Sequence, residues 1–120
     1  MANTKHLDIL KQGKAEWNQW RKNNTAELPD LSNVDLQDSD LHGINFENAN
    51  LRGANLFDVN FIGANLKNTD LQNSLLYEAR LDNADLRGAN LLKADGITSS
   101  LIKRAIYDES TQFPGYLNLK

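Results

Sequence analysis

A five-residue repeat runs through the middle of this 120-residue chain and constrains its fold more than any other feature. Read in fives from Pro29, the chain gives PDLSN VDLQD SDLHG INFEN ANLRG ANLFD VNFIG ANLKN TDLQN SLLYE ARLDN ADLRG ANLLK, which is 13 units ending at Lys93, and ADGIT follows as a degenerate unit. The third residue of every unit is Leu or Phe, and the first is usually small or apolar. The fold therefore has to bury a large apolar side chain at every fifth residue.

Neither a helix nor a continuous strand can bury this pattern. At about 100° per residue, a step of five turns about 500°, so successive leucines would move around a helix axis. An odd step in a strand places them on alternate faces. Within one unit, however, positions one and three share a face, and the fifth position is often Gly, Asn or Asp, which tolerate turn conformations. The repeat thus predicts short extended segments joined by corners, with the leucines inside and positions two and four outside.

The repeat resembles the A(D/N)LXX motif of the pentapeptide-repeat family over more than half of the chain, and the flanks KQGKAEWNQWR and RAIYDESTQFP resemble those of small cyanobacterial members. The resemblance implies an all-β solenoid, a right-handed quadrilateral parallel β-helix with four units per coil. Residue n then lies beneath residue n+20, and 13 units make about three coils. Both ends of such an open solenoid need covers.

The flanking segments fit that need. We expect a capping helix and linker over residues 1–28, the β-helix over 29–95, and a C-terminal cap and tail over 96–120. Residues 5–22 fit one α-helix, and its candidates for packing on the first coil are Leu7, Leu10, Trp17 and Trp20. At the other end, Ser99 or Ser100 could cap a short helix. Its apolar residues would be Leu101, Ile102, Ala105 and Ile106, with Phe113 and Tyr116 packed beside the last coil.

Composition narrows the class of protein. There are no cysteines, no apolar run approaches the roughly 18 residues of a membrane span, and MANTKHLDIL lacks the apolar run of a secretory signal. The net charge of −3 divides into +2 over residues 1–28, −6 over 29–95 and +1 over 96–120. We therefore expect a cytoplasmic protein without a membrane partner and without direct nucleic-acid binding, because the coils carry no basic footprint.

The residues suggest no catalytic centre. His6 and His42 are the only histidines, and no HExxH or Ser/His/Asp grouping can be assembled around them, so we expect both on the solvated surface. Trp17 and Trp20 fit a helix packed on the core better than a ligand site. We expect no enzyme activity and no cofactor. A metal binder is the alternative, and its only candidate ligands are Asp38, Asp58 and Glu78.

Two adjacent units break the polar pattern at position two. From Asp30 to Asp95 every fifth residue is Asp or Asn except Leu75 and Arg80. Stacking by twenty places Phe57 and Tyr77 in one outward column. Together with an acidic column, these positions predict an apolar patch with a charged border along one edge, a pattern typical of protein contacts. We call this set of predicted interaction residues the edge patch: Asp38, Phe57, Asp58, Ile62, Leu75, Tyr77, Glu78 and Arg80.

The edge patch favours a non-enzymatic interaction or scaffold module that binds an unidentified protein as a monomer or weak dimer. Two alternatives are that these positions vary freely, or that the C-terminal tail covers them. A further alternative is a DNA mimic that binds a nucleic-acid enzyme such as a topoisomerase. Duplex DNA carries about nine charges over the roughly 16 Å of the predicted column. Here the 11 acidic residues are spread over four faces and offset to a net −6 by five cations: Arg52, Lys67, Arg80, Arg87 and Lys93.

Overall fold

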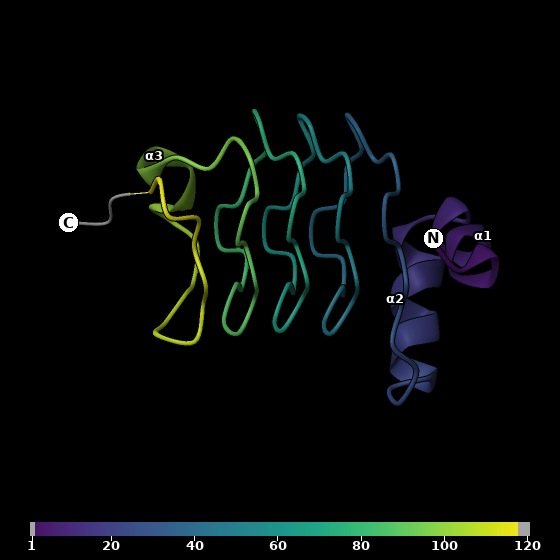
Figure 1. The fold of residues 1–120 in the computed structure, drawn as a ribbon. Coiled ribbons are helices and arrows are strands. Elements are labelled where there is room, and N and C mark those ends of the chain that lie inside the picture. Colours follow the sequence, from purple (N-terminus) through teal and green to yellow (C-terminus); the bar gives the residue numbers. More distant parts are fainter. Residues whose placement is uncertain (1, 118–120) are drawn as a thin grey trace.

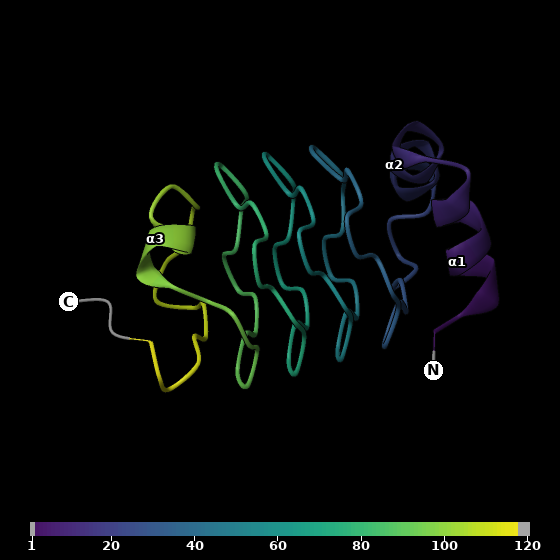
Figure 2. The same ribbon diagram turned by 90° about the horizontal axis from the view of Figure 1, so that it is seen from above.

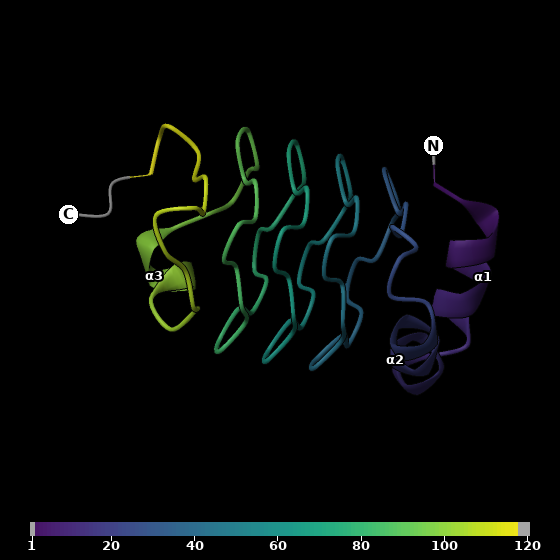
Figure 3. The ribbon, with the colours of Figure 1, turned by 90° about the horizontal axis from the view of Figure 1, so that it is seen from below.

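The computed structural model describes residues 2–117, which form a column of stacked coils with helices at both ends. Helices α1 (Thr4–Lys11) and α2 (Lys14–Asn23) lie at the N-terminal end, and α3 (Ser99–Ile102) lies at the other. Figure 2 shows the coils side by side along the long axis of a molecule that measures 40 × 22 × 21 Å. The view from below in Figure 3 shows the same order of helices and coils.

The register of the coils is the one that the resemblance to pentapeptide-repeat proteins implies. Parallel bridges join the second residue of each unit to the residue twenty positions later, from Asp30↔Asn50 to Leu75↔Asp95. Four units therefore make one coil. Within the described residues the ladder consists of isolated single-residue bridges. Strands of two or more residues are absent there because the chain turns again after each bridge.

Each corner is a β-turn whose third residue has a left-handed backbone. The first residue of the next unit donates its N–H to the carbonyl of position three, as from Ala49 to Phe46 at 2.9 Å. The fifth residue has a φ between 56° and 75° in all 13 units. Gly and Asn tolerate this conformation, which explains their frequency there. Glu78 and Lys93 adopt it without that tolerance.

The core confirms the predicted inward positions. Every position-three side chain is buried except that of Leu36, which is half-buried on the first coil. Trp17 of α2 extends the core. Its ring packs edge-on against Phe46 with the ring centroids 5.4 Å apart, and the centroids of Phe46 and Phe61 are 6.0 Å apart. Trp17 is therefore a core residue that joins α2 to the first coil.

The N-terminal segment differs from the single predicted helix over residues 5–22. Gly13 has a φ of 111°, which interrupts the helical backbone between α1 and α2. α2 then meets the bridge residue Asn45, which has no coil beneath it. Trp17 Nε1 donates to the Asn45 carbonyl at 2.7 Å, and the Asn45 N–H donates to Asn18 Oδ1 at 2.8 Å. Side chains of α2 thus replace the backbone partners that a further coil would supply.

The expectation that His6 lies on the surface is wrong. His6 is 3% exposed, and its Nδ1 accepts the N–H of the bridge residue Asp30 at 2.9 Å. Its Nε2 lies 2.7 Å from Glu27 Oε2, while the Asn3 N–H donates to the Asp30 carbonyl at 2.9 Å. The open edge of the first coil explains the burial, because Asp30 needs two hydrogen-bond partners from outside the ladder. His42 is exposed, as expected.

The C-terminal segment is less helical than predicted. α3 ends at Ile102, and its N-cap is Thr98, whose Oγ1 accepts the N–H of Leu101 at 3.0 Å, so neither Ser99 nor Ser100 is the cap. The chain then returns to the ladder, where Ile106 pairs with Asp85 and Gln112 with Asn90. These offsets exceed twenty because extra residues are inserted in this last, irregular coil. Phe113 packs half-buried against the core, as predicted.

Candidate protein-interaction surface

The Asp/Asn column has a structural role that the sequence analysis missed. In 11 repeat units the Oδ1 of position two accepts the backbone N–H two residues later, at 3.0–3.3 Å. This is an Asx turn, a local hydrogen bond that Asp and Asn side chains favour. The side chains of Leu75 and Arg80 have no oxygen that can accept, so the N–H groups of Tyr77 and Asp82 do not donate to a position-two side chain. The recurrence of Asp or Asn at position two, two residues before each turn residue at position four, was the sequence signal for these Asx turns.

The structure brings three apolar residues of the edge patch to one corner of the column. Leu75 pairs with Asn55 below it and is 39% exposed. Phe57 and Tyr77 occupy the same turn position in successive coils, and they are 39% and 50% exposed. The rings of Phe57 and Tyr77 do not form one of the ring–ring contacts found among residues 2–117. Both rings are therefore available to an external group.

Ile62 and Arg80 lie around the adjacent face. Arg80 is the bridge residue above Asn60, and it is exposed. Ile62 lies at the next turn after Phe57, beneath Asp82, whose carbonyl accepts the Gly63 N–H at 2.9 Å. The edge patch is thus an apolar corner at Phe57, Leu75 and Tyr77, followed by a mixed face that ends at Ile62.

The acidic column of Asp38, Asp58 and Glu78 borders this corner. Each of the three occupies the left-handed position of its turn, and the ladder bonds from Asp38 N to Phe57 O and from Asp58 N to Tyr77 O stack them directly. Partial desolvation, a hydrogen bond with Asp58 and the nearby carboxylates of Asp58 and Asp35 raise the pKa of Asp38. The crowding of negative charge favours a cationic group on the partner side.

The described residues give no support to a metal site or to a membrane-spanning helix. Among residues 2–117, no group of three His, Cys, Asp or Glu side chains is placed to hold a metal ion, so Asp38, Asp58 and Glu78 do not converge as ligands. None of the described helices has the length and apolar character required to cross a membrane.

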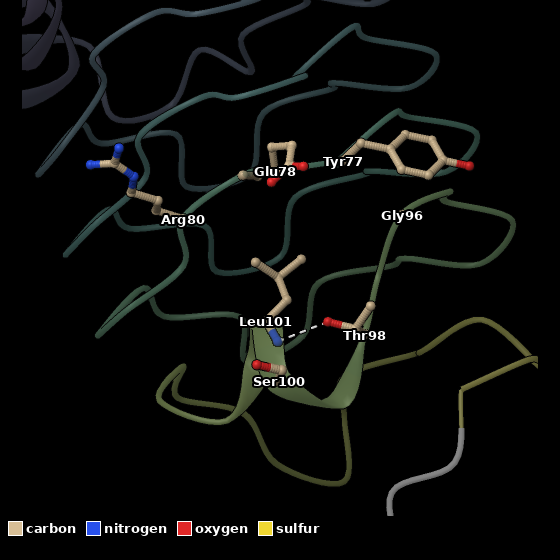
Figure 4. A pocket seen from close by; sticks show the side chains of 8 residues that line it. Tyr77, Glu78, Arg80, Gly96, Thr98, Ser100 and Leu101 are labelled. Atoms are coloured by element: carbon tan, nitrogen blue, oxygen red, sulfur yellow. Dashed lines mark hydrogen bonds between the residues drawn. The ribbon is translucent and has the colours of Figure 1, made fainter.

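A hollow of about 500 Å³ adjoins the edge patch at the C-terminal end of the column. Figure 4 shows the segment from Tyr77 to Arg80 along one side, with Gly96, Thr98, Ser100 and Leu101 opposite. Gly96 lies so close to Tyr77 that an added Cβ would be 2.6 Å from the Tyr77 nitrogen. The hollow exists because the chain leaves the coil at this glycine. The sequence analysis missed it, although the regular units end at Lys93 and the Asp/Asn column ends at Asp95.

Comparisons with known proteins agree on one family. The family model for pentapeptide repeats matches residues 30–56 and 54–91 with eight copies. The solved structure of HetL, a pentapeptide repeat protein involved in heterocyst differentiation regulation from the cyanobacterium Nostoc sp. strain PCC 7120, is 33% identical, with a TM-score of 0.53. The match covers 69% of this chain and 38% of HetL.

Two further cyanobacterial structures are similar. Rfr23 from Cyanothece 51142 is 35% identical over 70% of this chain and 60% of its own, with a TM-score of 0.36. The pentapeptide repeat protein alr5209 from Nostoc PCC 7120 is 31% identical over 76% of this chain and 74% of its own, also with a TM-score of 0.36. The chain spans less than two thirds of the length of HetL and Rfr23. A comparison with curated proteins found no match. The family-model match and the similarity to HetL imply a right-handed β-helix solenoid, the fold that the sequence resemblance also implies.

Proposed function

Because the chain belongs to the pentapeptide-repeat family, whose members are typically non-enzymatic interaction or structural proteins, we propose that it is a scaffold module that presents a rigid β-helix surface to a protein partner. The contact surface is the edge patch, with Phe57, Leu75 and Tyr77 at its centre. Asp58 and Glu78 supply its acidic border.

The observation that carries this proposal is that position two at Leu75 holds an exposed apolar side chain in place of an Asp or Asn side chain. Position two provides an oxygen for an Asx turn in 11 of the 13 units, whereas Leu75 exposes 39% of an apolar residue and provides none. The isolated chain gains neither the hydrogen bond nor full burial of the side chain. A partner that covers Leu75, Phe57 and Tyr77 would gain about 25 cal/mol per Å² of apolar area. Aromatic side chains are also the usual anchors of protein contacts.

The DNA-mimicking alternative has no comparable support in the geometry. A mimic needs a regular row of uncompensated acids. Here Arg87 donates to Asp85 at 2.6 Å, and Arg52 lies 3.8 Å from Asp70. The coil faces therefore carry paired charges of both signs, and only the acidic column is uncompensated over several coils.

An affinity capture from the source cell tests the proposed surface. The Phe57→Ala/Tyr77→Ala variant should capture the partner at least about tenfold less well, because truncations at a patch centre commonly cost 1–2 kcal/mol or more each. Its melting temperature should stay within a few degrees of the wild-type value. Leu92→Ala is the matched control, since Leu92 is also 39% exposed but lies on another corner. Equal capture by all three proteins would contradict the edge patch.

We also propose that α1 and α2 act as a cap on the first coil. Arg21 supports this role, because it is 4% exposed and its guanidinium donates to the carbonyls of Glu27 and Glu47 at 2.8 and 2.7 Å. Deleting residues 2–24 should remove these bonds and the Trp17 contact, and so expose an apolar end with unpaired backbone groups. The truncated protein should aggregate in light scattering. A truncated chain that stays monomeric with an unchanged melting temperature would rule out the cap.

A further inference from the structure

The hydrogen-bonded ladder is interrupted above Arg80. One coil lower, Asn60 is flanked by the bonds that complete a bridge: Arg80 donates its N–H to Val59, and Phe61 donates its N–H to Arg80, both at 2.9 Å. The next coil should repeat this arrangement with a residue above Arg80. Its partners would be the Ala79 carbonyl and the Leu81 N–H.

That residue is missing from the ladder. Among residues 2–117, neither the Ala79 carbonyl nor the Leu81 N–H has a hydrogen-bond partner, and the N–H of Glu78 also lacks one. Ser100, which the register of twenty would place above Arg80, lies in α3 instead. Backbone pairing resumes only at Asn83, which donates to the Arg104 carbonyl at 2.9 Å.

The gap is held open by the contacts of the C-terminal segment. The Ile97 N–H donates to the Tyr116 hydroxyl at 3.2 Å, and Thr98 caps α3, so the chain is directed away from the coil after Gly96. Figure 4 shows Leu101 pointing from α3 toward the segment that ends at Arg80, with the hollow between them. Glu78 and Ala79, which carry two of the three unpaired backbone groups, line this hollow, and Leu81 directly follows Arg80, which also lines it.

We propose that an extended peptide segment of the protein partner adds to this edge, with one of its residues filling the ladder position above Arg80. The N–H of that residue donates to the Ala79 carbonyl, and its carbonyl accepts the Leu81 N–H, as in β-strand addition to an open sheet edge. The segment runs parallel to the coil. The inference deepens the proposed function and rests on it, because it specifies how the partner is held beside the edge patch.

The surroundings define the chemistry of the segment. Toward its N-terminus, the peptide passes Tyr77 and the acidic column that ends at Glu78. An apolar side chain can contact Tyr77 and Leu75, and a Lys or Arg can compensate the three stacked carboxylates. We therefore expect an apolar and a basic residue shortly before the residue that pairs above Arg80. Proline is excluded at the pairing residue because it has no N–H to donate.

Amide exchange of the full chain tests whether the edge is open. The Leu81 and Glu78 amides should exchange rapidly in the free protein. The Phe61 and Asp58 amides are matched controls, because they hold the same positions one coil lower and donate to Arg80 and Tyr77. We expect them to exchange at least about 100-fold more slowly. Equal protection of Leu81 and Phe61 in the free chain would overturn the proposal.

Peptides selected from a random 12-residue phage library, panned on the full chain, test whether a peptide segment can fill the ladder position above Arg80. A selected peptide should slow exchange at Leu81, and N-methylation of its pairing residue should weaken binding at least about tenfold. N-methylation of a neighbouring residue should change binding less than about twofold. Failure to select any peptide that binds more tightly than about 1 mM would overturn the proposal.

The hydrogen-bonded pairing of a peptide above Arg80, here called the edge pairing, and the contact at the edge patch can be disproved independently of each other. Peptides that lose binding with Phe57→Ala/Tyr77→Ala but leave the Leu81 amide unprotected would overturn the edge pairing and retain the edge patch. Peptides that protect Leu81 and are indifferent to that double change would retain the edge pairing and overturn the edge patch as the centre of contact.

Discussion

The Tyr116 hydroxyl accepts the N–H of Ile97 at 3.2 Å, and so performs at the end of the column the task that an Asp or Asn oxygen performs in the repeat units. Ile97 follows Asp95 by two residues, the spacing of the Asx turns. The same hydroxyl donates to the Ala94 carbonyl at 2.5 Å. The Tyr116 side chain thus joins the C-terminal segment to the degenerate unit ADGIT that follows the last regular unit.

Tyr116→Phe should lower stability with little change in shape, because it removes both hydrogen bonds and keeps the ring. The expected loss is about 1–2 kcal/mol, from two bonds that each contribute about 0.5–1.5 kcal/mol in a partly exposed place. Thermal unfolding followed by circular dichroism measures it. Tyr107→Phe is the control, because the Tyr107 ring packs against Phe113 in a T-shaped arrangement that does not require the hydroxyl. Equal melting temperatures for the two variants would show that the Tyr116 hydroxyl contributes nothing.

Restoring the column with Leu75→Asn and Arg80→Asn should stabilise the protein while weakening its partner binding. Each Asn can accept the N–H two residues later, and such a bond contributes about 0.5–1.5 kcal/mol. Asn55→Leu is the reverse change in the same column and should be destabilising, since it removes the bond from the Phe57 N–H at 3.1 Å. Chemical unfolding of the three variants gives the comparison. A destabilised Asn variant would mean that Leu75 or Arg80 is structural.

Gly96→Ala should be far more damaging than Gly63→Ala. Both glycines have a positive φ, of 88° and 69°, so both changes carry the cost of a left-handed alanine, about 1–2 kcal/mol. At Gly63 a Cβ would meet nothing within 4 Å, whereas at Gly96 it would lie 2.6 Å from the Tyr77 nitrogen and 2.9 Å from its Cα. The difference between the unfolding free energies isolates the clash. Similar losses at both sites would show that the chain near Gly96 can move away from Tyr77.

Glu27→Gln should reduce the acid sensitivity of the N-terminal segment. The hydrogen bond from His6 is the main reason that the pKa of Glu27 lies below its ordinary value, with Lys5 adding to the effect. A lowered folded-state pKa means that the carboxylate stabilises the fold above the unfolded pKa of about 4.3 and that this contribution is lost as pH falls through the folded pKa.

Urea unfolding at pH 7 and at pH 3 separates the two states of the carboxyl group. Wild type should be the more stable protein at pH 7, and the difference from Glu27→Gln should shrink at pH 3. Glu16→Gln on the exposed surface of α2 should show no such change. A difference between wild type and Glu27→Gln that is the same at both pH values would contradict the role of the charge.

The edge patch shows where prediction from the sequence reached its limit. The interruption at Leu75 and Arg80 located an unusual corner, because stacking by twenty assigns every outward side chain to a column. It did not reveal the hollow beside Arg80. That hollow depends on the path after Gly96, which is set by contacts with Tyr116, twenty residues away.

The repeat by itself determined the short extended segments, the corners between them and the inward third residue. Nearly every unit contains the same local chemistry, namely an apolar third residue, an oxygen at position two except at Leu75 and Arg80, and usually a residue that tolerates positive φ at position five, so the corners follow without knowledge of distant contacts. The number of units per coil was an implication of the family resemblance. Only the tertiary structure decided the two ends. His6, Asn18 and Trp17 are placed by the unpaired backbone groups of Asp30 and Asn45. Local periodicity cannot specify such partners, because it repeats within the coils and stops where the ladder loses its next coil.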